Sequence, residues 1–215
     1  RRKNPGRDVI SHLIAEGYTN TDILVECVTY GTAGMVTTRE FIVMACWHLL
    51  RHDRLRERYL AAGQEERYAI LNEIIRLEPV VGHLYRRATA EVRIADRGQD
   101  WTVAPGDLID VCVRQANADP DAVGEAPLDL CPARPLPGGV NAAVLTFGDG
   151  AHRCPGQPLA LLETDVLLTR LLALGPVLVR EPELGWDNLI EGYWLRGFEL
   201  RLDPEGSAAT SGERG

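Results

Sequence analysis

The sequence predicts a mainly α-helical protein with a small, separate β portion. Apolar residues recur at helical spacing through most of residues 8–77 and again in the run Leu159–Leu172. Between Tyr85 and Val113 the pattern changes to short apolar runs separated by glycine and proline turns. With 45% hydrophobic and 25% charged residues, the 215-residue chain has the composition of a globular protein with a sizeable core.

The N-terminal helical segments have recognisable start and stop signals. Gly17 is well placed to end the first, and Pro79 to stop the last. Thr19 and Asp22 resemble a capping box, with Asp in the place usually taken by Glu or Gln. We expect helices over Asp8–Glu16, about Thr21–Leu50, Arg51–Ala62 and Gln64–Leu77.

The β portion is expected between Tyr85 and Val113, where apolar residues alternate or cluster around Asp-Arg-Gly and Pro-Gly turns. The residues that carry this pattern are Val92, Ile94, Trp101, Val103, Leu108, Ile109 and Val111.

The rest of the chain is expected to alternate between loop, helix and strand. Five prolines predict that Asp119–Gly139 has no regular structure. A helix follows over Leu159–Leu172, and then strands over Val177–Val179 and Tyr193–Leu202. Gly206–Gly215, a Ser/Gly/Ala tail without large apolar residues, is expected to be disordered.

Charge and cysteine usage narrow the classes of function. A net charge of −8 without a basic stripe argues against nucleic acid. Cys27–Thr38, the longest uncharged stretch in the first apolar segment, is too short to span a bilayer, and no secretory signal is evident, so the sequence shows no sign of membrane interaction. The five cysteines are scattered without CxxC pairing, which favours a reducing compartment, the cytoplasm.

A glycine-rich turn, Phe147–Gly156, places one cysteine, Cys154, just before an apolar helical run. A metal-binding thiolate needs its charge stabilised, and the backbone N–H groups of a tight turn can do that. Pro155 fits the first position of a helix. Spacing alone leaves equally open a buried free cysteine beside a surface loop.

This turn and the helix after it resemble the haem-binding signature of the cytochrome P450 family. The pattern Phe-Gly-x-Gly-x-His-x-Cys-x-Gly followed by x-x-Leu-Ala-x-x-Glu is matched at Phe147, Gly148, Gly150, His152, Cys154, Gly156, Leu159, Ala160 and Glu163. The resemblance implies that Cys154 is the axial thiolate ligand of the iron of haem b. It also implies that His152 hydrogen-bonds a haem propionate.

A second segment, Gly31–Thr38, is unusual for the middle of an apolar helix because its two glycines and three threonines lower helix propensity. Ala33 and Gly34 would let a flat ligand approach the backbone, and Thr37 lies on the same face. Close helix packing with back-bonded threonines is the alternative. The segment resembles the family's Ala-Gly-x-acid-Thr motif on the long distal helix, which implies that Thr37 hydrogen-bonds dioxygen or a proton-relaying water.

The distal motif departs from the family pattern at Val36, where Asp or Glu is usual. No carboxylate occurs between Glu26 and Glu40, so the usual group for proton delivery is missing. Glu40 lies one turn beyond Thr37, and we interpret it as a solvated charge rather than a substitute.

Glu73 and Arg76 lie three apart on one expected helix, which by itself is a common surface pair. Their position resembles the family's Glu-x-x-Arg pair, which implies a structural role in locking the helix to the loop before the cysteine. Arg134 is a candidate third partner. Asn117 begins Asn-Ala-Asp-Pro, which is similar to a family turn with alanine replacing arginine at position 118.

The run after Pro79 resembles the family segment that lines the substrate pocket and ends in a propionate-binding arginine. The resemblance places Val80, Val81 and Gly82 against substrate. Arg86 fits the propionate register, with Arg87 as the alternative, since arginine binds carboxylates bidentately. A pair of solvated arginines at a strand start is the other interpretation.

The resemblance runs from about Asp8 to Leu202 and corresponds to the C-terminal half of the P450 fold: the long distal helix, the Glu-x-x-Arg helix, the cysteine loop and the helix after it. Residues 1–205 are therefore expected to form the C-terminal part of one haem-binding catalytic domain. The implied activity is insertion of one atom of O₂ into a small organic substrate, with electrons from a ferredoxin and its reductase, for which Arg153 could help docking. A peroxygenase and an inactive haem-binding fragment are the alternatives.

Overall fold

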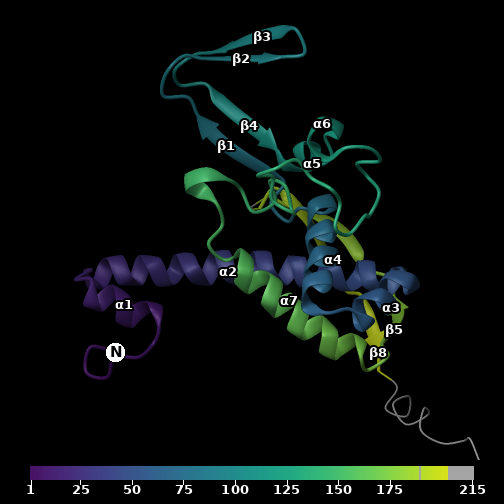
Figure 1. Cartoon of the computed structure of the whole chain (residues 1–215). Helices are drawn as coiled ribbons and strands as arrows, with labels where there is room; N and C mark the ends of the chain where they lie inside the picture. Colours follow the sequence, from purple (N-terminus) through teal and green to yellow (C-terminus); the bar gives the residue numbers. More distant parts are fainter. Residues whose placement is uncertain (189, 203–215) are drawn as a thin grey trace, which may run out of the picture. The chain divides into compact units, whose positions relative to one another are not determined.

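A computed structural model describes residues 1–188 and 190–202 (Figure 1). The chain divides into two compact units, residues 1–39 and the part from residue 40 onward, and each is described by itself. The predicted tail, Gly206–Gly215, lies outside the described residues. The mainly helical class with small sheets is confirmed. That residues 1–205 belong to one catalytic domain stays a prediction.

The first unit contains one short helix and the start of a long one. Helix α1 (Val9–Ala15) ends before Gly17, whose φ of +84° is the left-handed conformation that glycine adopts most readily. Helix α2 (Asn20–Arg51) begins at the predicted capping box. The Thr19 amide donates to Asp22 Oδ2 at 3.0 Å, and the Asp22 amide donates to Thr19 Oγ1 at 3.2 Å.

The second unit has a helical core. The end of α2 continues into it, followed by α3 (Asp53–Ala61), α4 (Gln64–Leu77) and, much later in the chain, α7 (Gln157–Leu172). Helices α3, α4 and α7 pack on one another (Figure 1). The apolar side chains that the unit buries most completely include Phe41, Leu49, Ile70, Leu71, Ile74 and Leu168.

A buried carboxylate joins these three helices. Asp165 on α7 accepts from Arg67 on α4, with Nε–Oδ1 at 2.6 Å and Nη2–Oδ2 at 3.0 Å, and from the Tyr59 hydroxyl on α3 at 2.7 Å. Burial alone would raise the pKa of Asp165, but the bonds from Arg67 and Tyr59 outweigh it, and the pKa is lowered. The ionised carboxylate therefore clamps α3 and α4 onto α7.

The β portion consists, in the described residues, of separate two-stranded antiparallel sheets. Strand β1 (His83–Arg87) pairs with β4 (Leu108–Cys112), and β2 (Val92–Asp96) pairs with β3 (Gln99–Val103) as the outer hairpin of the teal arm in Figure 1. Two short helices, α5 (Val113–Asn117) and α6 (Pro120–Val123), follow β4.

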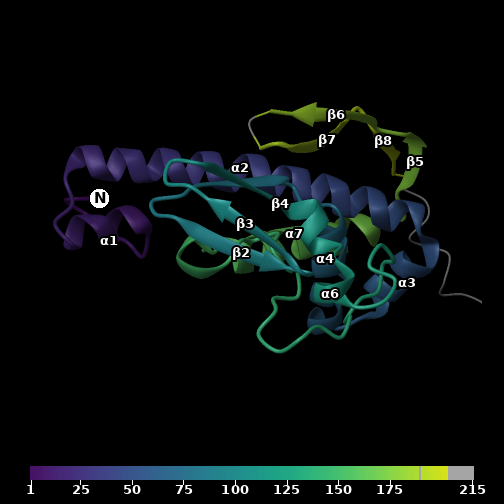
Figure 2. The same cartoon turned by 90° about the horizontal axis from the view of Figure 1, so that it is seen from above.

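The remaining strands form two ladders at the end of the described chain. Strand β5 (Val177–Arg180) pairs with β8 (Glu199–Arg201), and β6 (Glu183–Asp187) pairs with β7 (Gly192–Arg196). Figure 2 shows the two ladders next to each other, with β7 leading into β8. No helix in the described residues combines the length and apolar character that a membrane crossing needs.

Several sequence expectations about boundaries were wrong. The strand pattern ends at Cys112, because Val113 already starts α5. The proline-rich loop contains α6, whose N-cap Asp119 accepts from the Asp121 amide and so makes use of Pro120 at the first helical position. Pro155 does not start α7; the N-cap is Gly156, and Pro158 is the proline in the first turn.

The turn of the β6–β7 hairpin meets the segment after α4 through main-chain atoms. The Gly82 amide donates to Glu191 O at 3.0 Å. A Cβ on Gly82 would lie 2.1 Å from Glu191 O, and a Cβ on Gly192 would lie 1.9 Å from Val80 O. Only glycine fits at either position, because both obstacles are backbone oxygens that no rotamer change can move.

We expect Gly192→Ala to lower the free energy of unfolding by about 3 kcal/mol, because the added methyl group forces two main-chain segments apart. Gly63→Ala is the matched control, since a Cβ there meets nothing within 4 Å and its φ of −71° suits any residue. Urea denaturation followed by circular dichroism measures both. Equal stability of the two variants would contradict the close approach.

Candidate functional site

The cysteine loop is folded by its own backbone hydrogen bonds. The Cys154 amide donates to Phe147 O at 2.7 Å, which brings the two ends of the loop together around the one-turn 3₁₀ helix η1 (Gly150–His152). Gly148 and Gly150 have φ values of +67° and +60°. A Cβ on Gly148 would also lie 3.2 Å from His152 O, so the glycine both takes the left-handed conformation and makes room for the loop.

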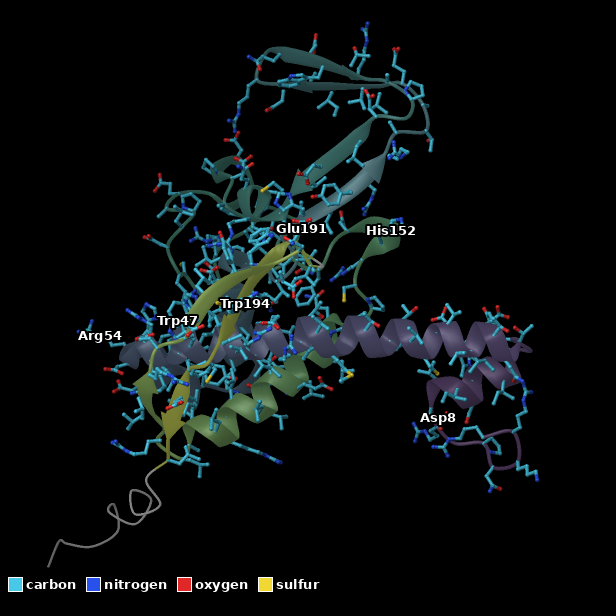
Figure 3. All side chains as sticks on the ribbon, turned by 180° about the vertical axis from the view of Figure 1, so that it is seen from behind. Asp8, Trp47, Arg54, His152, Glu191 and Trp194 are labelled. Atoms are coloured by element: carbon cyan, nitrogen blue, oxygen red, sulfur yellow. The ribbon has the colours of Figure 1, made fainter. Side chains whose placement is uncertain are left out.

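Cys154 is a free, half-buried thiol at the end of this loop. A Cβ on Gly156 would lie 3.7 Å from its Sγ, an ordinary contact, so the glycine leaves open the space beside the sulfur. One soft thiolate donor on a fixed backbone is the donor set that suits haem iron, so the residues present fit that group. His152 is exposed on η1 (Figure 3).

The helix after the loop starts one turn beyond the thiol. Gly156 O accepts from the Ala160 amide at 2.9 Å, which fixes the first turn of α7 onto the residue that flanks Cys154. Ala160 is half-buried. The glycine, the alanine and the cysteine that the sequence pattern singled out are therefore held in one short rigid stretch.

Glu73 and Arg76 form a buried pair near the end of α4, not a surface pair. Arg76 donates from Nε to Glu73 Oε2 at 2.7 Å and from Nη2 to Oε1 at 2.8 Å, and the two side chains are 0% and 3% exposed. Arg134 Nε donates to Glu73 Oε1 at 3.2 Å, so Arg134 is the third partner that the sequence suggested. The Cys131 amide donates to the same oxygen at 3.0 Å.

The two arginines of this cluster also organise the loop between α5 and the cysteine. Arg76 Nη1 donates to Asn117 O at 2.7 Å and to Pro127 O at 2.8 Å. Arg134 donates from Nη1 to Glu125 O at 2.8 Å and from Nη2 to Asp129 O at 2.7 Å. Carbonyls that lack a helix or a ladder are thus satisfied by buried guanidinium groups.

Asn117 carries the connection to the cysteine loop. Its Nδ2 donates to Arg76 O at 3.0 Å and to Thr146 Oγ1 at 2.8 Å, and its Oδ1 accepts from the Leu145 amide at 2.9 Å. The Thr146 hydroxyl donates in turn to Ile75 O at 3.0 Å. The residues directly before Phe147 are therefore tied to the end of α4.

Sequence reasoning treated Asn117 only as part of a turn and missed this role. The side chain is fully buried, at 0% exposure, and all its polar atoms are engaged. An asparagine between a short helix and an Asp-Pro turn gives no signal of long-range bonding, because its partners lie 28 to 41 residues away.

Glu73 stays ionised in this buried cluster. Burial would raise its pKa, but the bonds from Arg76, from the Cys131 amide and from Arg134 together lower it below the ordinary value. A lowered pKa means that ionised Glu73 stabilises the fold above the pKa of an unfolded glutamate. This stabilisation is lost as the pH falls through the lower, folded-state pKa.

The threonine segment lies in the first unit, within an unbroken stretch of α2. Thr37 Oγ1 donates to Ala33 O at 2.6 Å, the back-bonded arrangement that sequence analysis had as an alternative. A Cβ on Gly34 would meet nothing within 4 Å, and Ala33 and Gly34 are exposed. The hydroxyl oxygen of Thr37 keeps its acceptor capacity.

The interpretation of Glu40 as a solvated charge was wrong. Glu40 belongs to the second unit and is 2% exposed. Arg196 on β7 holds it bidentately, with Nη1–Oε2 and Nη2–Oε1 both at 2.7 Å, and lies over the Trp194 ring with 5.3 Å from Cζ to the ring centre. The pair joins α2 to the β6–β7 hairpin, and Figure 3 labels Trp194 on that hairpin.

The residues expected to line a substrate pocket and to bind a propionate lie between α4 and β1 and on β1 itself, and they differ in burial. Val80 is buried and Val81 is half-buried, while Gly82 packs on the main chain of Glu191. Arg86 is exposed on β1, and its Nη1 donates to Tyr85 O at 2.8 Å.

The alternative propionate residue, Arg87, donates to Gly106 O at 2.5 Å. Neighbouring strand residues point to opposite faces, so Arg86 and Arg87 do not share a face of the sheet.

Comparison with known proteins identifies the family. The sequence profile of the family described as Cytochrome P450 matches residues 68–174. Human steroid 21-hydroxylase is 36% identical over 66% of the chain, and cytochrome P450 130 from Mycobacterium tuberculosis is 31% identical over 87%. The crystal structure of Mycobacterium smegmatis CYP164A2 with econazole bound superposes with a TM-score of 0.72 over 93% of the chain, at 27% identity.

The chain belongs to the cytochrome P450 family, and membership implies a haem cofactor. It spans 29% of the human protein, 46% of cytochrome P450 130 and 48% of the CYP164A2 chain, so it corresponds to about half or less of each. The resemblance on which sequence analysis relied is confirmed.

We expect Asn117→Ala to loosen the cysteine loop while the helical core persists, because Leu145 and Thr146 lose their bonds to α4. Hydrogen exchange of the Leu145 and Cys154 amides should accelerate by about tenfold or more, the equivalent of one lost buried hydrogen bond. Asn72→Ala is the control: Asn72 Nδ2 donates to Tyr68 O within α4. Unchanged exchange in Asn117→Ala would contradict the proposed link.

We expect Glu73→Gln to cost about 3 kcal/mol of stability at neutral pH, since it leaves two buried arginines without their carboxylate. Because the folded-state pKa of Glu73 is lowered, the difference between wild type and variant should shrink as the pH falls below about 4.5. Urea titrations at several pH values measure it. A difference that stays constant down to pH 3 would contradict the assignment.

Proposed function

We propose that the chain is the C-terminal part of the catalytic domain of a haem-thiolate monooxygenase, with Cys154 as the axial ligand of haem b. The single observation that carries the proposal is the Cys154 loop, whose glycines and Phe147–Cys154 bond present one free thiol on a fixed backbone. Human steroid 21-hydroxylase, a hydroxylase by name, supports the class of reaction.

The residues that would hold the haem lie on two stretches of the second unit, residues 147–160 and strand β1. Cys154 supplies the thiolate, with Phe147, Gly148, Gly156 and Ala160 forming the backbone and surface beside it. His152 and Arg86 are proposed to bind the propionates, since both can donate to carboxylates and both are exposed. When bound, haem supplies the activation of O₂ that inserts one oxygen atom into an organic substrate.

The chain's own residues serve binding, positioning and proton movement. Thr37, with Ala33 and Gly34 beside it, is proposed to bind a water molecule or dioxygen through its hydroxyl. A water can donate to Oγ1 while Oγ1 donates to Ala33 O, whereas a bond to dioxygen requires the hydroxyl to release Ala33 O. Val80, Val81 and Gly82 are proposed to border a small organic substrate. The cluster of Glu73, Arg76 and Arg134 is proposed to stabilise the conformation of the cysteine loop and of the loop before it, and to take no part in the reaction.

The electrons are proposed to come from a ferredoxin and its reductase. Arg153 is exposed beside Cys154 and could pair with an acidic carrier, for which a cation at the rim of the docking face speeds association. A cytoplasmic location belongs to the same proposal, because the five cysteines are free thiols.

A peroxide-driven reaction is the second candidate, and one structural observation favours it. Val36 replaces the usual acid, and Glu40, the nearest carboxylate after it, is buried and held at both oxygens by Arg196. A carboxylate fixed in this way is poorly placed to relay protons. Substrate oxidation with hydrogen peroxide but not with reductant and O₂ would favour this candidate over the monooxygenase.

The test is the carbon monoxide spectrum of the reduced chain after reconstitution with haem. We expect a strongly red-shifted Soret band, because thiolate ligation alters the electronic structure of the iron, and its loss in Cys154→Ser. Cys27→Ser is the matched control, since Cys27 is an exposed thiol in the other unit. An unchanged band in Cys154→Ser would contradict the proposal. Failure of the wild-type chain to take up haem would mean that this part of the domain does not hold the group by itself.

A further inference from the structure

A second thiol, Cys112, lies on the β1–β4 sheet, away from the cysteine loop. The register of that sheet places His83 directly opposite Cys112 and Tyr85 directly opposite Asp110. Residues two apart on a strand share a face, so all four side chains lie on one face of the sheet. Directly opposed residues have Cβ atoms about 4.5–5.5 Å apart, which is within reach of a thiol and an imidazole.

Asp110 fixes the protonation of His83. Its carboxylate oxygens lie 3.0 and 2.9 Å from His83 Nδ1. An ionised carboxylate can only accept, so Nδ1 carries the ring proton and Nε2 has the free lone pair. A histidine oriented by a carboxylate, with a basic nitrogen left for a nucleophile, is the arrangement that activates thiols in covalent catalysis.

A pocket gives small molecules access to this pair. His83 and Cys112 both line it, and Cys112 is free and half-buried. Its other walls come from the segment between α4 and β1, from α5 and from the β6–β7 hairpin, with Glu191 labelled at the hairpin turn in Figure 3. The residues lining these other walls are Pro79, Gly82, Arg114, Trp186, Glu191, Gly192 and Tyr193.

We propose that Cys112 is a thiol modification site for small carbon electrophiles, in which Cys112 is the nucleophile, His83 its base and Asp110 the group that orients His83. The reaction with iodoacetamide defines the step. The bond from Cys112 Sγ to carbon forms, the carbon–iodine bond breaks, and iodide leaves with the bonding electron pair. The thiol proton passes to His83 Nε2.

The charged groups around His83 are compatible with this role. The hairpin contributes Glu191 and Tyr193, and β1 contributes Tyr85 beside the ring. Partial desolvation and then the carboxylates of Glu191 and Asp110 raise the pKa of Tyr85, so both carboxylates lie near this face of the sheet. Asp110 can accept from His83 Nδ1 both before and after the proton has been transferred.

Arg114 is the cation of this pocket, and it is already engaged. Its Nη2 donates to Glu78 Oε2 at 3.0 Å, and its Cζ lies 4.7 Å from the centre of the Tyr193 ring. The bonds from Arg114 hold it against α4 and the hairpin. Burial would raise the pKa of Glu78, but His48 and Arg114 lower it, so this counter-charge persists at neutral pH.

The experiment alkylates the full chain with iodoacetamide and follows each cysteine separately by peptide mass spectrometry. Cys46 is the internal control for folding, because it is buried and burial raises the pKa of its thiol to about 11, so it should stay unlabelled. Exposed Cys27 is the standard for reagent delivery. The variants are His83→Gln and Asp110→Asn.

We expect the labelling rate of Cys112 to rise by much less than tenfold per pH unit between about pH 6 and pH 8, because His83 rather than hydroxide takes the thiol proton. At about pH 6.5, His83→Gln should lower this rate at least about tenfold relative to Cys27, and Asp110→Asn should lower it by less, because an unpaired thiol is mostly protonated there.

Two results would overturn the inference. One is a Cys112 rate that rises about tenfold per pH unit from pH 6 to pH 8, as for a thiol that ionises alone. The other is an equal Cys112 rate in wild type and His83→Gln while Cys46 stays protected in both. Neither readout requires bound haem, so the inference stands or falls independently of the proposed function.

Discussion

The buried cluster of Glu73, Arg76 and Arg134 is the interaction on which the arrangement of the second unit depends. The Glu73 carboxylate accepts from both guanidinium groups and from the Cys131 amide. The remaining N–H groups of the two arginines donate to carbonyls of a loop without regular structure. Such a cluster costs desolvation energy, so its value is specificity more than net stability. It selects one path for a chain segment that has neither helix nor ladder to define it, and Asn117 passes this order on to the cysteine loop.

The sequence predicted the parts of the site that depend on local rules. Glycines at turns, a cysteine at the end of a loop and periodic apolar helices are local signals, and the structure has them where the pattern placed them. Apart from element boundaries and one strand, the failures concerned contacts between residues far apart in the sequence. Glu40 looked like a solvated charge because nothing near it in sequence reveals Arg196, 156 residues away. Strand β6 was missed because its residues Glu183–Asp187 are mostly exposed and give no clear alternation.

Cys154 in the cysteine loop and Cys112 on strand β4 have very different local environments. Cys154 ends a loop that is closed by the bond from its own amide to Phe147 O, and a glycine, Gly156, lies beside its thiol. Cys112 lies in a regular strand, where the neighbours are side chains chosen by register. The first environment suits a ligand to a large planar group, and the second suits proton transfer between side chains. Both follow from secondary structure rather than from the cysteine itself.

Main-chain atoms on both sides make close contacts between the Val80–Gly82 segment and the turn of the β6–β7 hairpin. A change of the Val81 side chain therefore leaves these main-chain contacts in place, whereas Glu191, with a φ of +46°, favours residues that tolerate the left-handed conformation. The spacing between the two segments is set by Gly82 and Gly192, whereas the side chain at position 81 does not determine it. A single substitution at position 81 can thus change the surface of this segment while the backbone around it keeps its spacing.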